Sequence, residues 1–269
     1  MAIDSKVVFV GAGNMAEAIV SGMISGTFCA PSDIVLTDIR EDRLADLEKQ
    51  YGVRTSTDNG VVAGAEIVVL SVKPQIMADV LSEMSPILGS TTLVISIAAG
   101  VSASRIEAAL GGEVRVVRVM PNTPALIGMG ASGIAAGCKA TDDDMVTAEA
   151  VLGCVGLTVR VKESELDAVT ALSGSGPAYV FYLLESMLAA AGNMGLESET
   201  ARILALQTVE GAARLMKDSG EGAAELRAKV TSKGGTTAAA MESMESAGIK
   251  GSIIQALIAA RDRSVELSK

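Results

Sequence analysis

The residues whose types and spacing carry the clearest chemistry stand near the start of the chain. Residues 11–16 read Gly-Ala-Gly-Asn-Met-Ala and follow the apolar run Val7–Val10 directly. In this pattern Gly11 permits a tight turn, Gly13 lets a phosphate approach the backbone, and the small Ala16 lets a helix pack closely on the strand. The N–H groups at the start of that helix attract phosphate. We therefore expect a dinucleotide to bind here; the alternative is a glycine-rich turn without a ligand.

An acidic residue bears on which dinucleotide is bound. Asp38 ends the second apolar run, 22 residues after Ala16. A carboxylate at this place accepts hydrogen bonds from the ribose of NAD and repels the 2′-phosphate of NADP, whereas Arg40 and Arg43 offer charges that bind this phosphate. The alternative is that Asp38 only caps the helix that begins near Glu41. The cofactor is therefore expected to be NADPH or NADH, with a lean toward NADH competence.

Two loops follow later apolar runs at the same expected edge of the sheet. Ser71-Val-Lys73-Pro74 comes at the end of the run at 67–72, and Met120-Pro-Asn122-Thr-Pro-Ala125 follows the run at 114–119. The carboxyl ends of parallel strands face one ligand crevice. Lys73 then faces either the cofactor or solvent. Asn122 and the threonine after it offer donors near a nicotinamide, unless the loop is only a structural turn.

Two segments of small and hydroxyl residues lie in the second half of the chain. They read Ser173-Gly-Ser-Gly-Pro-Ala-Tyr179 and Thr231-Ser-Lys-Gly-Gly-Thr-Thr237. Hydroxyls and free backbone N–H groups at the start of a helix can bind a carboxylate without arginine. Serine and threonine also cap helices. The residues by themselves leave both interpretations open.

The expected elements divide the chain into two domains. Short apolar runs alternate with amphipathic stretches over the first 160 or so residues, which predicts a doubly wound, mostly parallel sheet in a Rossmann-type α/β domain at 1–162. Residues 163–269 read as helices nearly throughout, with wide apolar faces. We expect this all-α C-terminal domain to bury part of that surface against another chain.

Composition excludes several classes of function. The 269 residues include no histidine, so a Ser-His-Asp triad and a His-ligated zinc are excluded, and no metal is expected. The net charge of −10 argues against a nucleic-acid partner. No apolar run approaches the roughly 18 residues of a membrane span. A start that leads straight into a strand and three cysteines expected to be buried thiols predict a cytoplasmic protein without a signal peptide.

The motifs GAGNMA, VKP, MPNTPA, SGSGPAY and VTSKGGTT, in this order and spacing, resemble the pyrroline-5-carboxylate reductase family from Val7 to the helix after Thr237. The chain departs from the family's usual pattern at Lys233, where proline is usual, which bears on the rigidity and charge of that loop. The resemblance implies reduction of 1-pyrroline-5-carboxylate to L-proline by hydride from NADPH or NADH. It also implies a homodimer with interlocked helical domains, which can assemble into a larger ring such as a decamer. The active site then lies between one subunit's nucleotide domain and helices of the dimer.

The motifs and the resemblance together assign the site residues. For the cofactor they are Gly11, Ala12, Gly13, Asn14, Met15, Asp38, Arg40, Asn59, Val72, Lys73, Pro74, Ala98, Ala99 and Asn122. For the substrate they are Ser175, Thr231, Ser232, Gly234, Gly235, Thr236 and Thr237. By the same analogy Thr237 is the candidate catalytic residue, which bonds or protonates the ring nitrogen. A protonated cyclic imine is already electrophilic, so hydride transfer needs positioning more than strong acid catalysis, and a chain without histidine is no handicap.

Two other functions remain to be tested. A β-hydroxyacid dehydrogenase shares the plan of a Rossmann domain with helices but usually employs a lysine from the helical domain. Lys229 or Lys233 would have to serve, and neither lies in a matching helical motif. A non-catalytic dinucleotide-binding regulator would explain the glycine turn but would leave the Ser-Gly and Gly-Gly-Thr-Thr segments without a role.

Overall fold

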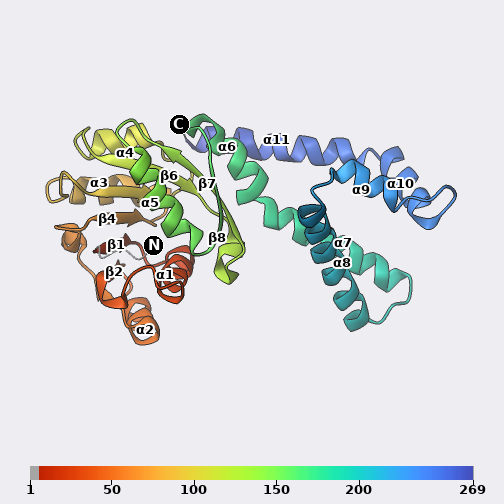
Figure 1. Ribbon diagram of the computed structural model, residues 1–269, viewed down its shortest axis with the longest axis horizontal. Coiled ribbons are helices and arrows are strands. Elements are labelled where there is room, and N and C mark those ends of the chain that lie inside the picture. Colours follow the sequence, from red (N-terminus) through yellow and green to blue (C-terminus); the bar gives the residue numbers. More distant parts are fainter. Residues whose placement is uncertain (1–5, 269) are drawn as a thin grey trace. The chain divides into compact units, whose positions relative to one another are not determined.

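The computed structural model describes residues 6–268, which form two compact units (Figure 1). The first unit contains a sheet of eight described strands in the order β3-β2-β1-β4-β5-β6-β7-β8. The strands are β1 (Val7–Val10), β2 (Ile34–Thr37), β3 (Arg54–Ser56), β4 (Ile67–Leu70), β5 (Leu93–Ser96), β6 (Arg115–Met120), β7 (Gly130–Ala136) and β8 (Gly156–Arg160).

The sheet is doubly wound and mostly parallel, as the sequence predicts. β1 pairs in parallel with both β2 and β4, so the strand order reverses at β1, and only β7 runs antiparallel to its neighbour β6 among the described strands. Ligands of such sheets bind beyond the carboxyl ends of the strands at the reversal. The glycine turn at residues 11–16 lies directly after β1, at this point.

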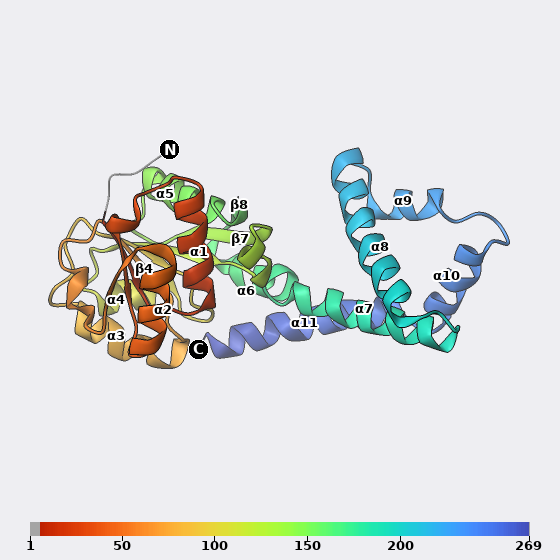
Figure 2. The same ribbon diagram turned by 90° about the horizontal axis from the view of Figure 1, so that it is seen from below.

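Helices cover both faces of the sheet, so both faces of its strands are buried, and β1 and β4 are apolar at every residue. On one face lie α1 (Asn14–Ser25), α2 (Glu41–Tyr51) and α5 (Asp142–Gly153); on the other lie α3 (Met77–Met84) and α4 (Ala103–Ala109). Figures 1 and 2 show α1 and α5 on the side of the sheet opposite α3 and α4. All four residues of β1, β2, β4 and β5 are buried.

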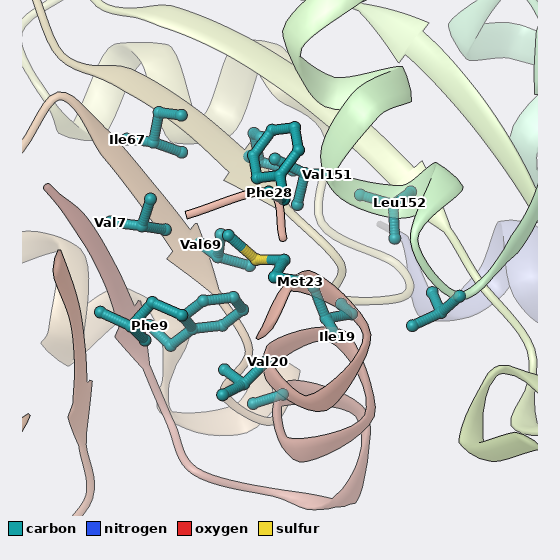
Figure 3. Packing of buried hydrophobic residues seen from close by; sticks show 14 of the residues in the cluster. Val7, Phe9, Ile19, Val20, Met23, Phe28, Ile67, Val69, Val151 and Leu152 are labelled. Carbon is teal, nitrogen blue, oxygen red and sulfur yellow. The ribbon is translucent and has the colours of Figure 1, made fainter. Parts of the chain in front are cut away.

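The core under α1 contains two of the three phenylalanines of the chain, Phe9 and Phe28. Phe9 is fully buried and lies beside Ile19, Val20 and Met23 of α1 (Figure 3). Valines and isoleucines from the neighbouring strands, with residues of α5, fill the remaining space. Only 2% of the residues are aromatic, so branched aliphatic side chains fill most of the volume of this core.

The second unit comprises residues 178–259 and is helical. Its helices include α8 (Ser198–Ser219), α9 (Ala223–Lys229) and α10 (Thr236–Ser246). The chain enters it within α7 (Gly176–Asn193) and returns to the first unit within α11 (Ile249–Leu267). The compact units therefore do not coincide with the change from mixed to helical structure after β8.

The return of α11 depends on contacts that no local pattern reveals. Ser264, which is buried, donates a hydrogen bond from Oγ to Oδ1 of Asp167 at 2.6 Å. Asp167 belongs to α6 (Leu166–Val169), 97 residues earlier in the chain. This bond holds the last turns of α11 on the first unit.

The structure differs from the sequence-based expectations in two local details. β3 was not expected, because Arg54-Thr-Ser is a polar strand at the edge of the sheet and carries no apolar pattern. The prediction that the cysteines are buried is wrong for Cys138, which is exposed, whereas Cys29 is buried and Cys154 is half-buried. Burial raises the pKa of the Cys29 thiol to about 11.

No helix within residues 6–268 has the length and apolar content needed to cross a membrane.

A pair of helical glycines tests the packing of α1. A Cβ added at Gly22 would lie 2.6 Å from Val155 Cγ1 and 2.8 Å from the carbonyl oxygen of Cys154, whereas a Cβ added at Gly153 would meet no atom within 4 Å. Gly22→Ala should therefore lower the free energy of unfolding by about 1–3 kcal/mol, because α1 must shift. Gly153→Ala should raise it by about 0.5–1 kcal/mol. Chemical denaturation measures both, and equal effects would contradict the close packing at Gly22.

Candidate active site

The glycine turn brings the ends of β1 and β4 into close contact. The N–H of Gly11 donates to the Thr37 carbonyl at 2.9 Å, and the N–H of Ser71 donates to the Val10 carbonyl at 2.8 Å. Gly11 has a φ of +98°, and a Cβ there would lie 2.7 Å from the Ser71 carbonyl oxygen. Only glycine fits this position without moving the backbone.

Gly13 lies at the start of α1 and faces open space. A Cβ added there would meet no atom within 4 Å. Gly13 is the N-cap of α1, and no side chain caps that helix. Its first N–H groups are therefore available to an acceptor from outside the chain, which is the arrangement that binds a phosphate. The geometry fits a pyrophosphate beside Gly13, Asn14 and Met15.

Asp38 holds the glycine turn and Arg40 together. Its Oδ2 accepts from the N–H of Ala12 at 3.0 Å, and its Oδ1 accepts from Nε of Arg40 at 3.0 Å. Burial raises the pKa of the Asp38 carboxyl, but the hydrogen bonds from Arg40 and Ala12 outweigh it, so the pKa lies below its usual value. Asp38 is thus a carboxylate next to the turn, while the Arg40 side chain is 54% exposed.

The second arginine of this region is tied to the protein. Arg43 donates from Nε to the Ala12 carbonyl at 3.0 Å and forms an ion pair with Glu17 of α1. The hydroxyl of Tyr51 also donates to Glu17, at 3.0 Å. Arg43 therefore fixes the glycine turn, which leaves Arg40 as the exposed cation beside Asp38.

Asn59 lies beside the end of β2. Its Oδ1 accepts from the hydroxyl of Thr37 at 2.7 Å, and its Nδ2 donates to Glu83 at 2.9 Å. Both ends of this amide thus contact side chains of the first unit. A role in binding the dinucleotide remains a prediction.

A cavity of about 510 Å³ joins several of the expected residues within the first unit. It is lined by Pro74, Gln75, Ala99, Gly100, Val101, Arg105, Thr170, Ser175, Ala260, Arg263, Ser264 and Leu267. Pro74 and Ala99 come from the loops after β4 and β5, and Ser175 comes from the Ser-Gly segment. The cavity therefore brings expected cofactor residues and an expected substrate residue together. Ala98 is buried next to it, Val72 is half-buried and Lys73 is exposed.

The end of α11 forms part of the cavity wall, which no pattern in the sequence predicted. A Cβ added at Gly100 would lie 3.2 Å from the carbonyl oxygen of Leu267. The only local signal is Gly100 itself, which adopts a φ of +73°. That signal indicates a turn and says nothing of which distant segment packs against it.

Asn122 is buried, and both ends of its amide contact backbone. Nδ2 donates to the Ser173 carbonyl at 3.1 Å, and Oδ1 accepts from the N–H of Ala131 at 2.8 Å. It thus connects the loop after β6 with the Ser-Gly segment.

The remaining expected substrate residues belong to the second unit. Thr231 donates from Oγ1 to the Arg227 carbonyl at 2.6 Å, and the N–H of Gly235 donates to the Ser232 carbonyl at 3.1 Å, so the loop between α9 and α10 is compact. Gly234 has a φ of +72°, and Lys233 is exposed.

The start of α10 bears on the two interpretations of Thr237. Gly235 is the N-cap of α10, and no side chain caps the helix. Thr236 and Thr237 are its first two residues, and Thr237 is half-buried. Thr237 is therefore not the helix cap, and the first N–H groups of α10 are open to an acceptor.

Within residues 6–268 no cluster of Cys, Asp and Glu could hold a metal ion.

Comparison with protein families gives two matches. Residues 163–267 match the family described as pyrroline-5-carboxylate reductase dimerisation. Residues 6–100 match the family described as NADP oxidoreductase, coenzyme F420-dependent. The two matches fall on the helical part and on the glycine-turn part of the chain.

Individual proteins match over the whole chain. A pyrroline-5-carboxylate reductase of Methanosarcina acetivorans is 44% identical over 267 residues, which are 99% of each chain. The solved structure of a pyrroline-5-carboxylate reductase from Coxiella burnetii is 41% identical with a TM-score of 0.93, over 99% of this chain and 100% of the other. The pyrroline carboxylate reductase of Plasmodium falciparum with NADP bound is 29% identical with a TM-score of 0.90, over 100% of both chains.

Likeness to hydroxyacid dehydrogenases is much weaker. The structure of 3-hydroxyisobutyrate dehydrogenase from Mycobacterium tuberculosis is 14% identical with a TM-score of 0.54, over 82% of this chain and 72% of the other. This likeness concerns the fold alone.

Substitutions at Asp38 and Arg40 should shift the choice of dinucleotide in opposite directions. Asp38→Asn removes a negative charge where a 2′-phosphate would lie, so binding should shift toward NADPH by roughly 1–2 kcal/mol, about five- to thirtyfold in the ratio of dissociation constants. Arg40→Ala removes the exposed cation and should shift the ratio toward NADH. Fluorescence titration with NADH and NADPH measures both ratios. Ratios unchanged in both variants would mean that this pair does not contact the ribose.

Proposed function

The chain belongs to the pyrroline-5-carboxylate reductase family, and from this membership we propose that it reduces 1-pyrroline-5-carboxylate to L-proline with hydride from NADPH or NADH. This is the last step of proline biosynthesis. The observation that carries the proposal is the cavity that joins Pro74 and Ala99, at the carboxyl edge of the sheet, with Ser175.

The residues of the first unit fit a bound dinucleotide. The open space at Gly13 and the uncapped start of α1 suit the pyrophosphate, and Asp38 and Arg40 stand where the adenine-side ribose is expected. Val72, Lys73, Pro74, Ala98 and Ala99 then line its nicotinamide half. When bound, the reduced nicotinamide supplies the hydride. The protein's own task is to orient it toward the imine carbon.

The second unit supplies groups for the imine. The open N–H groups at the start of α10 and the loop of Thr231, Ser232, Gly234 and Gly235 suit the substrate carboxylate. Thr237 offers a hydroxyl to the ring nitrogen, and the nitrogen must carry a proton when the carbon accepts hydride. These roles need an arrangement in which α10 of one copy meets the cavity of the same or another copy.

The apolar surface of the second unit favours a homodimer. Its only buried apolar residues are Ala201 and Ala205, whereas Phe181 is 60% and Tyr182 is 73% exposed. A groove on this unit is lined by Met241, Met244, Ile249, Ile253 and Ile254, together with Arg227, Glu245 and Lys250. Eighty or so residues without a core of their own need a partner surface. We propose a homodimer, which can assemble into a decamer, in the cytoplasm.

The function is tested by following nicotinamide absorbance at 340 nm. NADPH or NADH should be consumed with 1-pyrroline-5-carboxylate, and L-proline should form in equal amount. Consumption with a β-hydroxyacid and NAD instead would favour the dehydrogenase. Absence of turnover with both, together with tight dinucleotide binding, would favour a regulator.

Light scattering should show a dimer or a multiple of a dimer. Phe181→Asp places a charge on the exposed apolar surface of the second unit, so the dissociation constant should rise at least tenfold, about 1.4 kcal/mol. Ile39→Asp, which changes a residue 91% exposed in the first unit, is the control and should leave assembly unchanged. A monodisperse, active monomer would refute the dimer.

Thr237 tests the proposed proton path. Thr237→Ala removes the hydroxyl, so kcat should fall by roughly 1–3 kcal/mol, about five- to 150-fold, if the bond strengthens in the transition state. Dinucleotide affinity should barely change, and Thr237→Ser should retain most activity. Steady-state kinetics beside a melting curve measure these effects. A wild-type rate in the alanine variant would mean that the proton comes from water.

A further inference from the structure

Asn122 is a buried amide whose contacts lie on both sides of the site. It is 9% exposed and is held between the Ser173 carbonyl, to which Nδ2 donates at 3.1 Å, and the N–H of Ala131, which donates to Oδ1 at 2.8 Å. Each end of the side chain thus forms a hydrogen bond with a buried backbone group, which would be unfavourable without a partner.

The Ser173 carbonyl lacks its usual helical donor, so the amide of Asn122 takes that place. Its α-helical partner would be the N–H four residues later, but that residue is Pro177, which has none. The chain here forms a π-helical turn, Thr170–Gly174, closed by the N–H of Ser175 donating to the Thr170 carbonyl at 2.8 Å. Single π-helical turns are rare and occur frequently at functional sites.

The turn rests on the strand that leads to Asn122. A Cβ added at Gly174 would lie 2.6 Å from Cε of Met120, the last residue of β6. Ser175, the next residue, lines the cavity together with Pro74 and Ala99. The position of Ser175 therefore depends on the turn, and the turn is held by Met120 below and by Asn122 at the Ser173 carbonyl.

We infer that Asn122 is a positioning residue, which holds the π-helical turn so that Ser175 faces the imine, and is not itself a ligand of the dinucleotide. This inference rests on the proposed function, because it takes the cavity to be the place of the imine. On this inference the loop after β6 controls substrate binding. It does so through the hydrogen bond from Asn122 to the Ser173 carbonyl, which joins residues 51 positions apart.

The test separates imine binding from dinucleotide binding. Asn122→Asp keeps the acceptor for Ala131 but loses the donor for Ser173. It should lower kcat/KM for 1-pyrroline-5-carboxylate about tenfold, mostly through KM, while the dissociation constant for NADPH, measured by fluorescence titration, changes less than twofold. Asn122→Ser avoids a buried charge and should give the same split if the first variant melts too early. Asn193→Asp, the same replacement at the exposed end of α7, is the control.

A double variant tests whether Asn122 acts through Ser175. In a Ser175→Ala background, Asn122→Asp should cost little more than Ser175→Ala alone, because the two changes remove one shared effect. Effects that multiply, or an NADPH affinity that weakens along with the imine KM, would overturn the inference. Failure of the proposed function is distinct, since the wild type itself would then not consume NADPH with the imine.

Discussion

The site depends on a position where a side chain is absent. At Gly11 a Cβ would lie 2.7 Å from the Ser71 carbonyl, so the ends of β1 and β4 can converge only because residue 11 is glycine. The peptide that follows is held from two directions, since Asp38 accepts from the N–H of Ala12 and Arg43 donates to its carbonyl. Two neighbouring elements thus fix one turn before any ligand binds. The open start of α1 is therefore preorganised for a phosphate, and ordering it costs little on binding.

The two units differ in how much of their apolar surface they bury by themselves. The first has apolar residues on both faces of its sheet and covers them with its own helices, which leaves Phe9, Ile19 and Met23 without exposed surface. The second buries only two alanines by itself. In the proposed homodimer its helices gain most of their stability from the partner surface and little from their own side chains. Folding of this unit and assembly of the proposed homodimer are in that sense one process.

Local patterns predicted much of the fold and the glycine turn of the candidate site, and contacts between distant residues account for the rest. The apolar runs that became β1, β2 and β4 and the turn at Gly11 are signals contained in a few neighbouring residues. β3 has no such signal, because an edge strand buries little. The contacts of Asn122 and Ser264 were not predictable, since their partners Ser173 and Asp167 lie 51 and 97 residues away. The sequence indicated that Asn122 is a donor in the right loop. It gave no means of knowing that a proline at position 177 leaves a carbonyl for that donor to satisfy.

The return of α11 makes the second unit an insertion with two covalent connections to the first. The ends of this insertion are residues 178 and 259, and the chain after it is anchored by the bond from Ser264 to Asp167. A protease cut in the loop between α9 and α10 would therefore yield two fragments that each keep part of the first unit. The shorter fragment would remain attached through the last turns of α11, and the nicked protein would purify as one particle.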